Sequence, residues 1–208
     1  MPMTAFARDE RNALADALLA AGPDAPTLCE GWATRDLAAH LVLREHRPDA
    51  AAGIMLKAVA GHTRKVQDSL AAGDYAALVQ RVRKGPALLR PFDEAMNVVE
   101  FFVHHEDIRR AAPEWSQRPI PQPYSQSLAK NAKRTARLSA RRFPARIEVS
   151  GPDVEPFTVN PKQERAVSIS GAPGELVLFF SGRQSSAEVS ITGPDDLTEK
   201  LRGARLGI

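Results

Sequence analysis

The segment from Asn97 to Arg110 constrains the fold most, because it sets ionisable groups into the most apolar run of the first two thirds of the chain. Read as an α-helix of 3.6 residues per turn, it places Glu100, His104 and Asp107 on one stripe at spacings of four and three. The other directions are covered by apolar side chains, namely Val98, Val99, Phe101, Phe102 and Val103. A helix that is apolar nearly all round is a buried helix, so the sequence predicts a buried helix that carries charged groups.

A carboxylate in a buried helix needs a partner, because an unpaired buried charge is costly and is otherwise removed by protonation. Glu100 and His104 lie four residues apart on one face and can reach a common divalent ion. With one ligand from another helix they would form the open three-ligand set typical of catalytic zinc. Alternatively, Glu100 pairs with an arginine or hydrogen-bonds His104 inside the core.

A second histidine that faces inward is predicted on a helix over residues 34–43. Thr34 can cap this helix, and Asp36 suits the positive end of its dipole. His40 lies on the same side as the leucines of this helix. Taken alone, His40 is explained either as a core histidine that hydrogen-bonds a backbone carbonyl or as a metal ligand.

The periodicity of the apolar residues changes at Ala145. Before it changes, helical spacing predicts helices over residues 4–21, 34–43, 49–71, 74–84, 91–110 and 122–142. From Ala145 onward, alternation predicts antiparallel strands over residues 146–151, 156–160, 166–171 and 187–192, with helices near 173–181 and 194–205. The sequence therefore predicts a mainly α fold with a C-terminal α+β part, divided into a helical domain, 1–142, and a small domain, 143–208.

The composition is that of an ordinary soluble globular protein. Hydrophobic residues make up 43% and charged residues 25% of the 208 residues, which excludes a disordered chain. The net charge of +3 is too small to imply nucleic acid.

The helix over 122–142 carries a basic stripe, which we interpret as a solvated face. Binding of an anionic ligand or nucleic acid is the alternative, but no interleaved aromatic residues support nucleic acid.

Cys29 is the only cysteine, which excludes an internal disulfide, a cysteine zinc cluster and a CxxC pair. It has no adjacent basic residue to lower its pKa, so we do not expect it to act as a nucleophile.

The N-terminal residues carry charges where a secretory signal needs an apolar core, and no stretch is long and apolar enough to span a membrane. We therefore expect a soluble, cytoplasmic protein.

Two distant segments together carry a resemblance to a known family. In Trp32–Leu41, a tryptophan is followed by a helix that ends in an inward histidine, and Glu100–Ile108 carries the pattern Glu-x-x-x-His-x-x-Asp. The pair resembles the metal-binding domain of mycothiol-dependent maleylpyruvate isomerase, a member of the DinB-like superfamily. The residues from 143 onward look like the small C-terminal domain of that family, which has a sterol-carrier-like shape.

The resemblance implies a fold and a ligand set. The fold would be a DinB-like antiparallel four-helix bundle followed by the small sterol-carrier-like domain. The ligands of a divalent metal, zinc foremost, fall on His40, Glu100 and His104. Asp107 occupies a frequently acidic position, where it would accept a ring N–H from a histidine ligand or fix a nearby arginine. His105 points about 100° away on the helix and should face elsewhere.

The activity implied by the resemblance is thiol chemistry. The metal would hold a low-molecular-weight thiol such as mycothiol, whose thiolate attacks a small-molecule electrophile in thiol transfer or thiol-assisted isomerisation. Two alternatives stay open: hydrolysis by a metal-activated water, and a metal- or ligand-binding module without catalysis. No nucleic acid and no membrane partner are expected, and a homodimer is one possible assembly. The resemblance does not identify the substrate.

Overall fold

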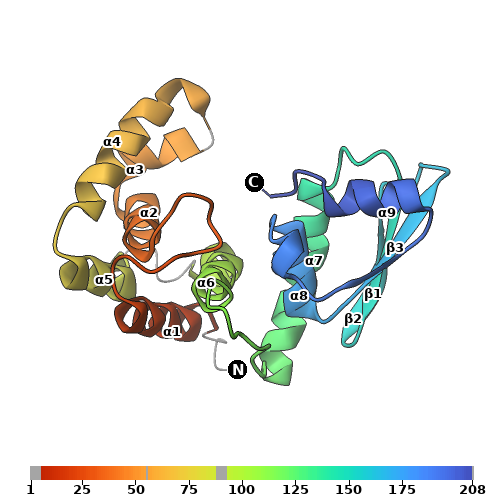
Figure 1. The fold of residues 1–208 in the computed structure, drawn as a ribbon, viewed down its shortest axis with the longest axis horizontal. Coiled ribbons are helices and arrows are strands. Elements are labelled where there is room, and N and C mark those ends of the chain that lie inside the picture. The colour runs from red at the N-terminus through yellow and green to blue at the C-terminus, as the bar shows by residue number, and fades with distance from the viewer. Residues whose placement is uncertain (1–5, 55, 88–92, 208) are drawn as a thin grey trace. The chain divides into compact units, whose positions relative to one another are not determined.

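The computed structural model describes residues 6–54, 56–87 and 93–207 of the chain (Figure 1). Backbone packing divides the chain into two compact units, Met1–Gln117 and Arg118–Ile208. Among the described residues, no helix is both long enough and apolar enough to cross a membrane.

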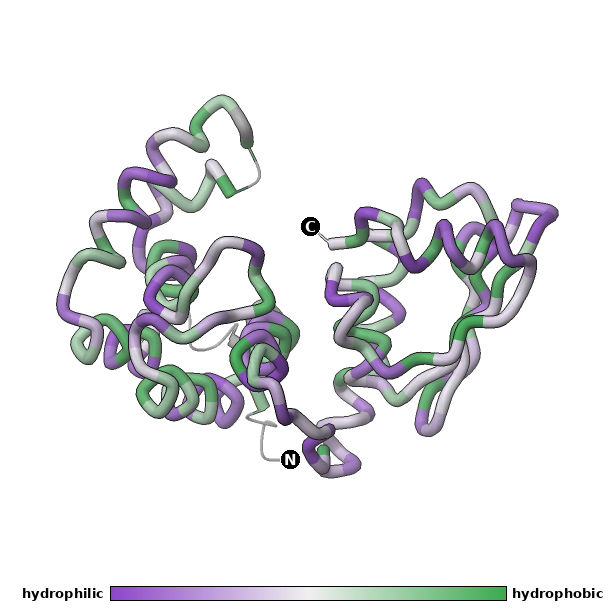
Figure 2. Tube along the Cα trace, in the orientation of Figure 1, coloured by the Kyte–Doolittle hydropathy of each residue, from purple (hydrophilic) through white to green (hydrophobic). Residues whose placement is uncertain are grey.

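The N-terminal unit is helical. Its elements are α1 (Phe6–Ala21), α2 (Thr34–His46), α3 (Pro48–Ala51), the 3₁₀ turns η1 (Ala52–Ile54) and η2 (Lys57–Val59), α4 (Ala60–Ala71), α5 (Tyr75–Lys84) and α6 (Asp93–Arg109). Helix α1 packs on α5 and α6, and α2 packs on α4 and α5. The apolar faces meet in a core that includes Leu14, Leu18, Leu37, Leu41, Phe101 and Phe102. Hydrophilic and hydrophobic residues intermix along α1, as expected of a helix with one buried face (Figure 2).

Helix α6 has the environment that the sequence predicts. Phe101 is fully buried, and Asp107 is also completely shielded from solvent. The expected first helical residue, Pro91, lies outside the described residues.

The prediction of one continuous helix over residues 49–71 is wrong, because 3₁₀ turns interrupt the helix between α3 and α4. Gly53 explains the break: a Cβ atom at this position would lie 2.0 Å from Thr63 Oγ1 and 2.7 Å from the carbonyl oxygen of Val59. Such close approach of two segments is open only to glycine. Thr63 Oγ1 donates a hydrogen bond to the carbonyl of Ala50, which holds the turn against α4.

The C-terminal unit contains a four-stranded mixed sheet with helices. Its elements are α7 (Gln122–Ser139), β1 (Arg146–Gly151), β2 (Val154–Val159), β3 (Ala166–Ser170), α8 (Pro173–Phe180), the 3₁₀ turn η4 (Gln184–Ser186), β4 (Ser190–Thr192) and α9 (Asp195–Arg202). The strand order is β2-β1-β3-β4. The prediction of antiparallel strands holds for β1–β2 and β3–β4, but β1 and β3 are parallel, with Ile147 opposite Val167.

Helix α7 belongs to the C-terminal unit by its packing. Its apolar face, which includes Leu128, Ala132 and Ala136, is buried, and the helix packs on α8 and β2. The two compact units therefore divide before α7, whereas the sequence interpretation placed this helix in a domain that ends at residue 142.

Candidate metal centre

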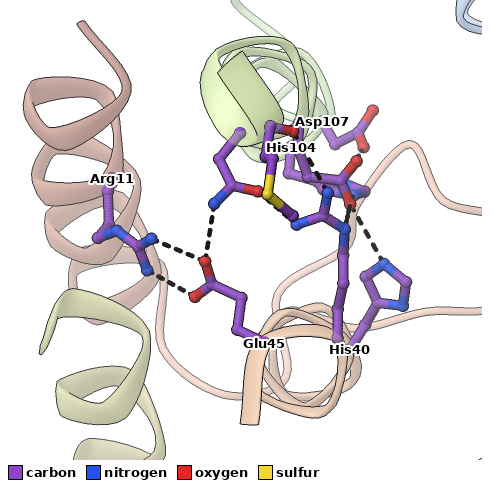
Figure 3. A network of polar contacts seen from close by, with 9 residues as sticks. Arg11, His40, Glu45, His104 and Asp107 are labelled. Carbon is purple, nitrogen blue, oxygen red and sulfur yellow. Dashed lines mark hydrogen bonds and ion pairs between the residues drawn. The ribbon is translucent and has the colours of Figure 1, made fainter. Parts of the chain in front are cut away.

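Helices α2 and α6 bring His40, Glu100 and His104 together. Figure 3 shows His40 and His104 in one network of polar contacts. Glu100 Oε1 lies 3.2 Å from His104 Nε2 and 3.5 Å from His40 Nε2. The three potential ligand atoms all lie within 4.8 Å of one another. The two segments that carry them are distant in the sequence, so the fold creates this cluster.

The start of α2 fixes the direction of His40. The backbone N–H of Ala33 donates to Asp36 Oδ2 at 2.9 Å, which ties the first turn of the helix to its N-terminal residue. His40 lies four residues after Asp36, a little over one helical turn, and is 9% exposed. The ring of Trp32 lies 5.1 Å from the ring of His40, centroid to centroid. His40 is therefore held between α6 and the loop that precedes its own helix.

Asp107 is a hydrogen-bond partner of His104. Its Oδ2 lies 2.9 Å from His104 Nδ1, and its carboxylate is completely buried. When Nδ1 donates to this carboxylate, Nε2 carries the lone pair and points toward Glu100. A carboxylate behind a histidine is the usual support of a metal-binding imidazole.

Cys29 is one of two residues beside the cluster that the sequence interpretation did not identify, and Arg44 is the other. Its Sγ lies 3.2 Å from Asp107 Oδ2, and Cys29, His104 and Asp107 form a second group with metal-ligand spacing. The backbone N–H of Leu28 donates to the carbonyl of Asp107 at 3.0 Å, which fastens the loop to α6. No local sequence signal reveals this contact, because Cys29 and Asp107 are 78 residues apart.

The charges within the cluster compensate one another. Burial alone would lower the pKa of His104, but hydrogen bonds with Asp107, Cys29 and Glu100 raise this pKa well above its usual value. Burial alone would raise the pKa of Glu100, but the hydrogen bonds with His104 and His40 and the charge of Arg44 hold it well below its usual value. Burial lowers the pKa of His40. The geometry therefore suits an ionised Glu100 that faces one cation or a protonated imidazole.

Both alternatives for Glu100 have geometric support. The hydrogen bond to His104 is present, and Arg44 Nε lies 3.4 Å from Glu100 Oε1. The guanidinium also binds the backbone carbonyl of Met96 and the side chain of Asn97. Its Nε contacts the same carboxylate oxygen, Oε1, that faces both imidazoles. Arg44 is therefore a neighbour of Glu100 within a cluster that also has the donor set of a metal site.

His105 faces away from the cluster, as the helical geometry predicts. Its Nδ1 lies 2.7 Å from Glu10 Oε1 on α1. His104 and His105 thus serve different interfaces of α6.

A cavity of about 470 Å³ adjoins His40. Its lining includes Trp32, His40, Ile54, Thr63, Arg64 and Asp68. The wall is partly apolar and partly charged, which suits a small polar molecule with an apolar part. The cavity gives such a molecule a place beside one of the candidate ligands.

A family described as "Mycothiol maleylpyruvate isomerase N-terminal domain" matches residues 5–124, which is more than half of the chain. No curated protein and no solved structure matches. The matched range contains His40, Glu100, His104 and Asp107 as well as Cys29 and Arg44.

Proposed function

The chain belongs to the mycothiol maleylpyruvate isomerase N-terminal domain family, and from this premise we propose that it binds a divalent metal, zinc foremost, through His40, Glu100 and His104. The observation that carries the proposal is the convergence of these three ligand atoms, from two helices, within 4.8 Å. Asp107 would orient the imidazole of His104 without touching the metal.

The donor set fits zinc. Two imidazole nitrogens and one carboxylate oxygen are ligands that zinc accepts, and three protein ligands leave one position for an exogenous molecule. Glu100 is 26% exposed, whereas the two imidazoles are about 10% exposed, so the carboxylate lies at the accessible side of the cluster. The arrangement favours an open site over a closed structural one.

We infer that the exogenous ligand is a low-molecular-weight thiol, mycothiol in the first instance, and that the reaction is thiol transfer to a small electrophile or thiol-assisted isomerisation. Bound zinc would lower the pKa of such a thiol and so favour its thiolate at neutral pH. The thiol would bind beside His40. Trp32 and Arg64, which line the adjoining cavity, would be available to contact the rest of the thiol molecule and the electrophile.

The family match to residues 5–124 and the four-stranded sheet of the C-terminal unit also bear on a finer description of the fold. We propose that the N-terminal helices form a DinB-like antiparallel four-helix bundle and that the strands and helices after it form a sterol-carrier-like domain. Helices α1, α2, α5 and α6 are the bundle candidates, because α1 packs on α5 and α6 and α2 packs on α5. An experimental structure of the zinc-loaded chain would test this arrangement, and a different packing of these four helices would reject it.

The experiment that tests the function combines metal analysis with a thiol panel. Elemental analysis and zinc titration of the purified chain should give one zinc per chain, and Glu100→Gln should weaken binding substantially. Turnover of a panel of small electrophiles should then require both zinc and mycothiol. Turnover with zinc but without thiol would indicate a hydrolase, and stable zinc without an exchangeable ligand would indicate a module without catalysis.

A further inference from the structure

A buried ion pair lies between α1 and α2, close to the proposed metal centre. Arg11 and Glu45 are 5% and 8% exposed, and two hydrogen bonds of 2.6 and 2.7 Å join them. Arg11 also donates to the carbonyl of Val82 at 2.9 Å and lies over the ring of Phe101. A buried ion pair adds little to stability, since desolvation offsets most of its attraction.

Asn97 connects this ion pair to the next arginine. It is 1% exposed, and its Nδ2 donates to Glu45 Oε1 at 3.0 Å. Its Oδ1 accepts a hydrogen bond from Arg44 Nη1. Figure 3 shows Arg11 and Glu45 facing each other, with the polar network continuing toward His40 and His104. Asn97 thus lies between the ion pair and the metal centre.

Arg44 completes the connection to the proposed ligand Glu100. On α2 it follows His40 by four residues, and on α6 Asn97 precedes Glu100 by three, so each pair shares a helical face. One planar guanidinium therefore contacts Asn97 through Nη1 and Glu100 through Nε. The contacts fix the orientation of the guanidinium, because its donors are held in a rigid fork.

We propose that Asn97 and Arg44 are positioning residues that hold Glu100 in the orientation required for metal binding. The inference rests on the proposed metal centre and adds to it a support for the carboxylate ligand, matching the support that Asp107 gives to His104. A free glutamate side chain loses rotamer entropy when it binds a metal, and an anchored one has already lost part of it. Groups that orient metal ligands typically contribute 10–100-fold to metal affinity.

Two variants that keep the net charge constant test this proposal. Asn97→Leu removes the uncharged side chain that hydrogen-bonds both Glu45 and Arg44, at nearly constant side-chain size. Arg44→Lys retains the positive charge, but an ammonium group cannot contact Asn97 and Glu100 in the way that a planar guanidinium does. We expect each to weaken zinc binding about tenfold or more in a chelator competition assay. In the cobalt-substituted protein, each should also change the visible absorption of the metal, which a purely structural role would leave unaltered.

Matched controls lie elsewhere in the chain. Asn131→Leu makes the same substitution on α7, where Asn131 bonds only the carbonyl of Ser127 among the contacts described. Arg47→Lys alters an arginine whose partner is the exposed Asp49. Both controls should retain the affinity and the cobalt spectrum of the unaltered protein.

The outcomes separate this inference from the proposed function. If the unaltered protein binds no zinc, the proposed metal centre fails. If it binds zinc and both variants bind zinc equally well or more tightly, with the same cobalt spectrum, the metal centre stands and the positioning role is overturned. Should Asn97→Leu fail to fold, Arg44→Lys decides alone, because Arg44 is partly exposed and tolerates substitution better than a buried residue.

Discussion

At the scale of single residues, His40 is the decisive ligand, because it is the only member of the proposed set on α2. Replacing it with alanine should release the metal, with an affinity loss above about 100-fold, since even the groups that only orient ligands contribute 10–100-fold. The helices should persist, which circular dichroism would show alongside zinc analysis. His62→Ala is the control, because His62 is 51% exposed and pairs with Asp49 away from the cluster. Unchanged zinc content in His40→Ala would remove His40 from the site.

Cys29 raises a second question at this scale, because His104 takes part in two groups with ligand spacing. We expect the metal to bind with His40 and Glu100, so cobalt-substituted protein should lack a sulfur-to-cobalt charge-transfer band. Absorption spectroscopy of the cobalt protein checks this, with Cys29→Ser as the matched variant. A near-ultraviolet band that disappears in Cys29→Ser would instead assign the metal to Cys29, His104 and Asp107.

The sequence predicted the composition of the cluster better than its surroundings. The spacing of Glu100, His104 and Asp107 follows from helical geometry alone, and all three lie on α6. The contacts of Cys29 and of Arg44 depend on how a loop and another helix pack against α6, which no local pattern contains. His40 could be added to the set only through the family resemblance.

At the scale of elements, the break between α3 and α4 depends on one glycine. Gly53→Ala should destabilise the N-terminal unit by roughly 1–3 kcal/mol, because the new methyl group would overlap Thr63 and the backbone of Val59. Gly61→Ala is the matched control on α4: nothing lies within 4 Å of its Cβ position, so the change should be neutral or stabilising by up to about 1 kcal/mol. Denaturant unfolding would compare the two. If both substitutions changed the free energy of unfolding equally, the absence of a side chain at Gly53 would not be what allows the turn.

Hydrophobic periodicity predicted the existence of elements more reliably than their connections. It could not reveal the interruption at Gly53, because apolar residues continue on both sides at helical spacing. It also could not give the direction of strand pairing: Ile147 and Val167 alternate with polar residues in the same way whether their strands run parallel or antiparallel. These features depend on close backbone approach and on topology.

At the scale of the whole molecule, backbone packing divides the chain into two compact units, Met1–Gln117 and Arg118–Ile208. The sequence pattern kept α7 with the earlier helices because all are amphipathic, and an apolar face does not identify its partner. Leu128 and Ala132 are buried where α7 packs on α8 and β2, so packing assigns this helix to the C-terminal unit. The proposed metal ligands all lie in the N-terminal unit, which makes metal binding and the stability of that unit thermodynamically linked.

This linkage predicts a selective stabilisation. Zinc at 100 times its dissociation constant should stabilise the N-terminal unit by about 2.7 kcal/mol, which raises the midpoint of a domain of this size by roughly 10 °C or more. Both tryptophans, Trp32 and Trp115, lie in this unit, so tryptophan fluorescence reports its unfolding separately from the C-terminal unit.

The shift in the unfolding midpoint should vanish with a chelator. It should also fade as the pH falls, because the metal binds only the neutral form of His40 and His104. Magnesium, which prefers oxygen ligands, is the control cation and should leave the fluorescence midpoint unchanged. An equal shift with both cations, or none with zinc, would contradict a metal centre built from two imidazoles and one carboxylate.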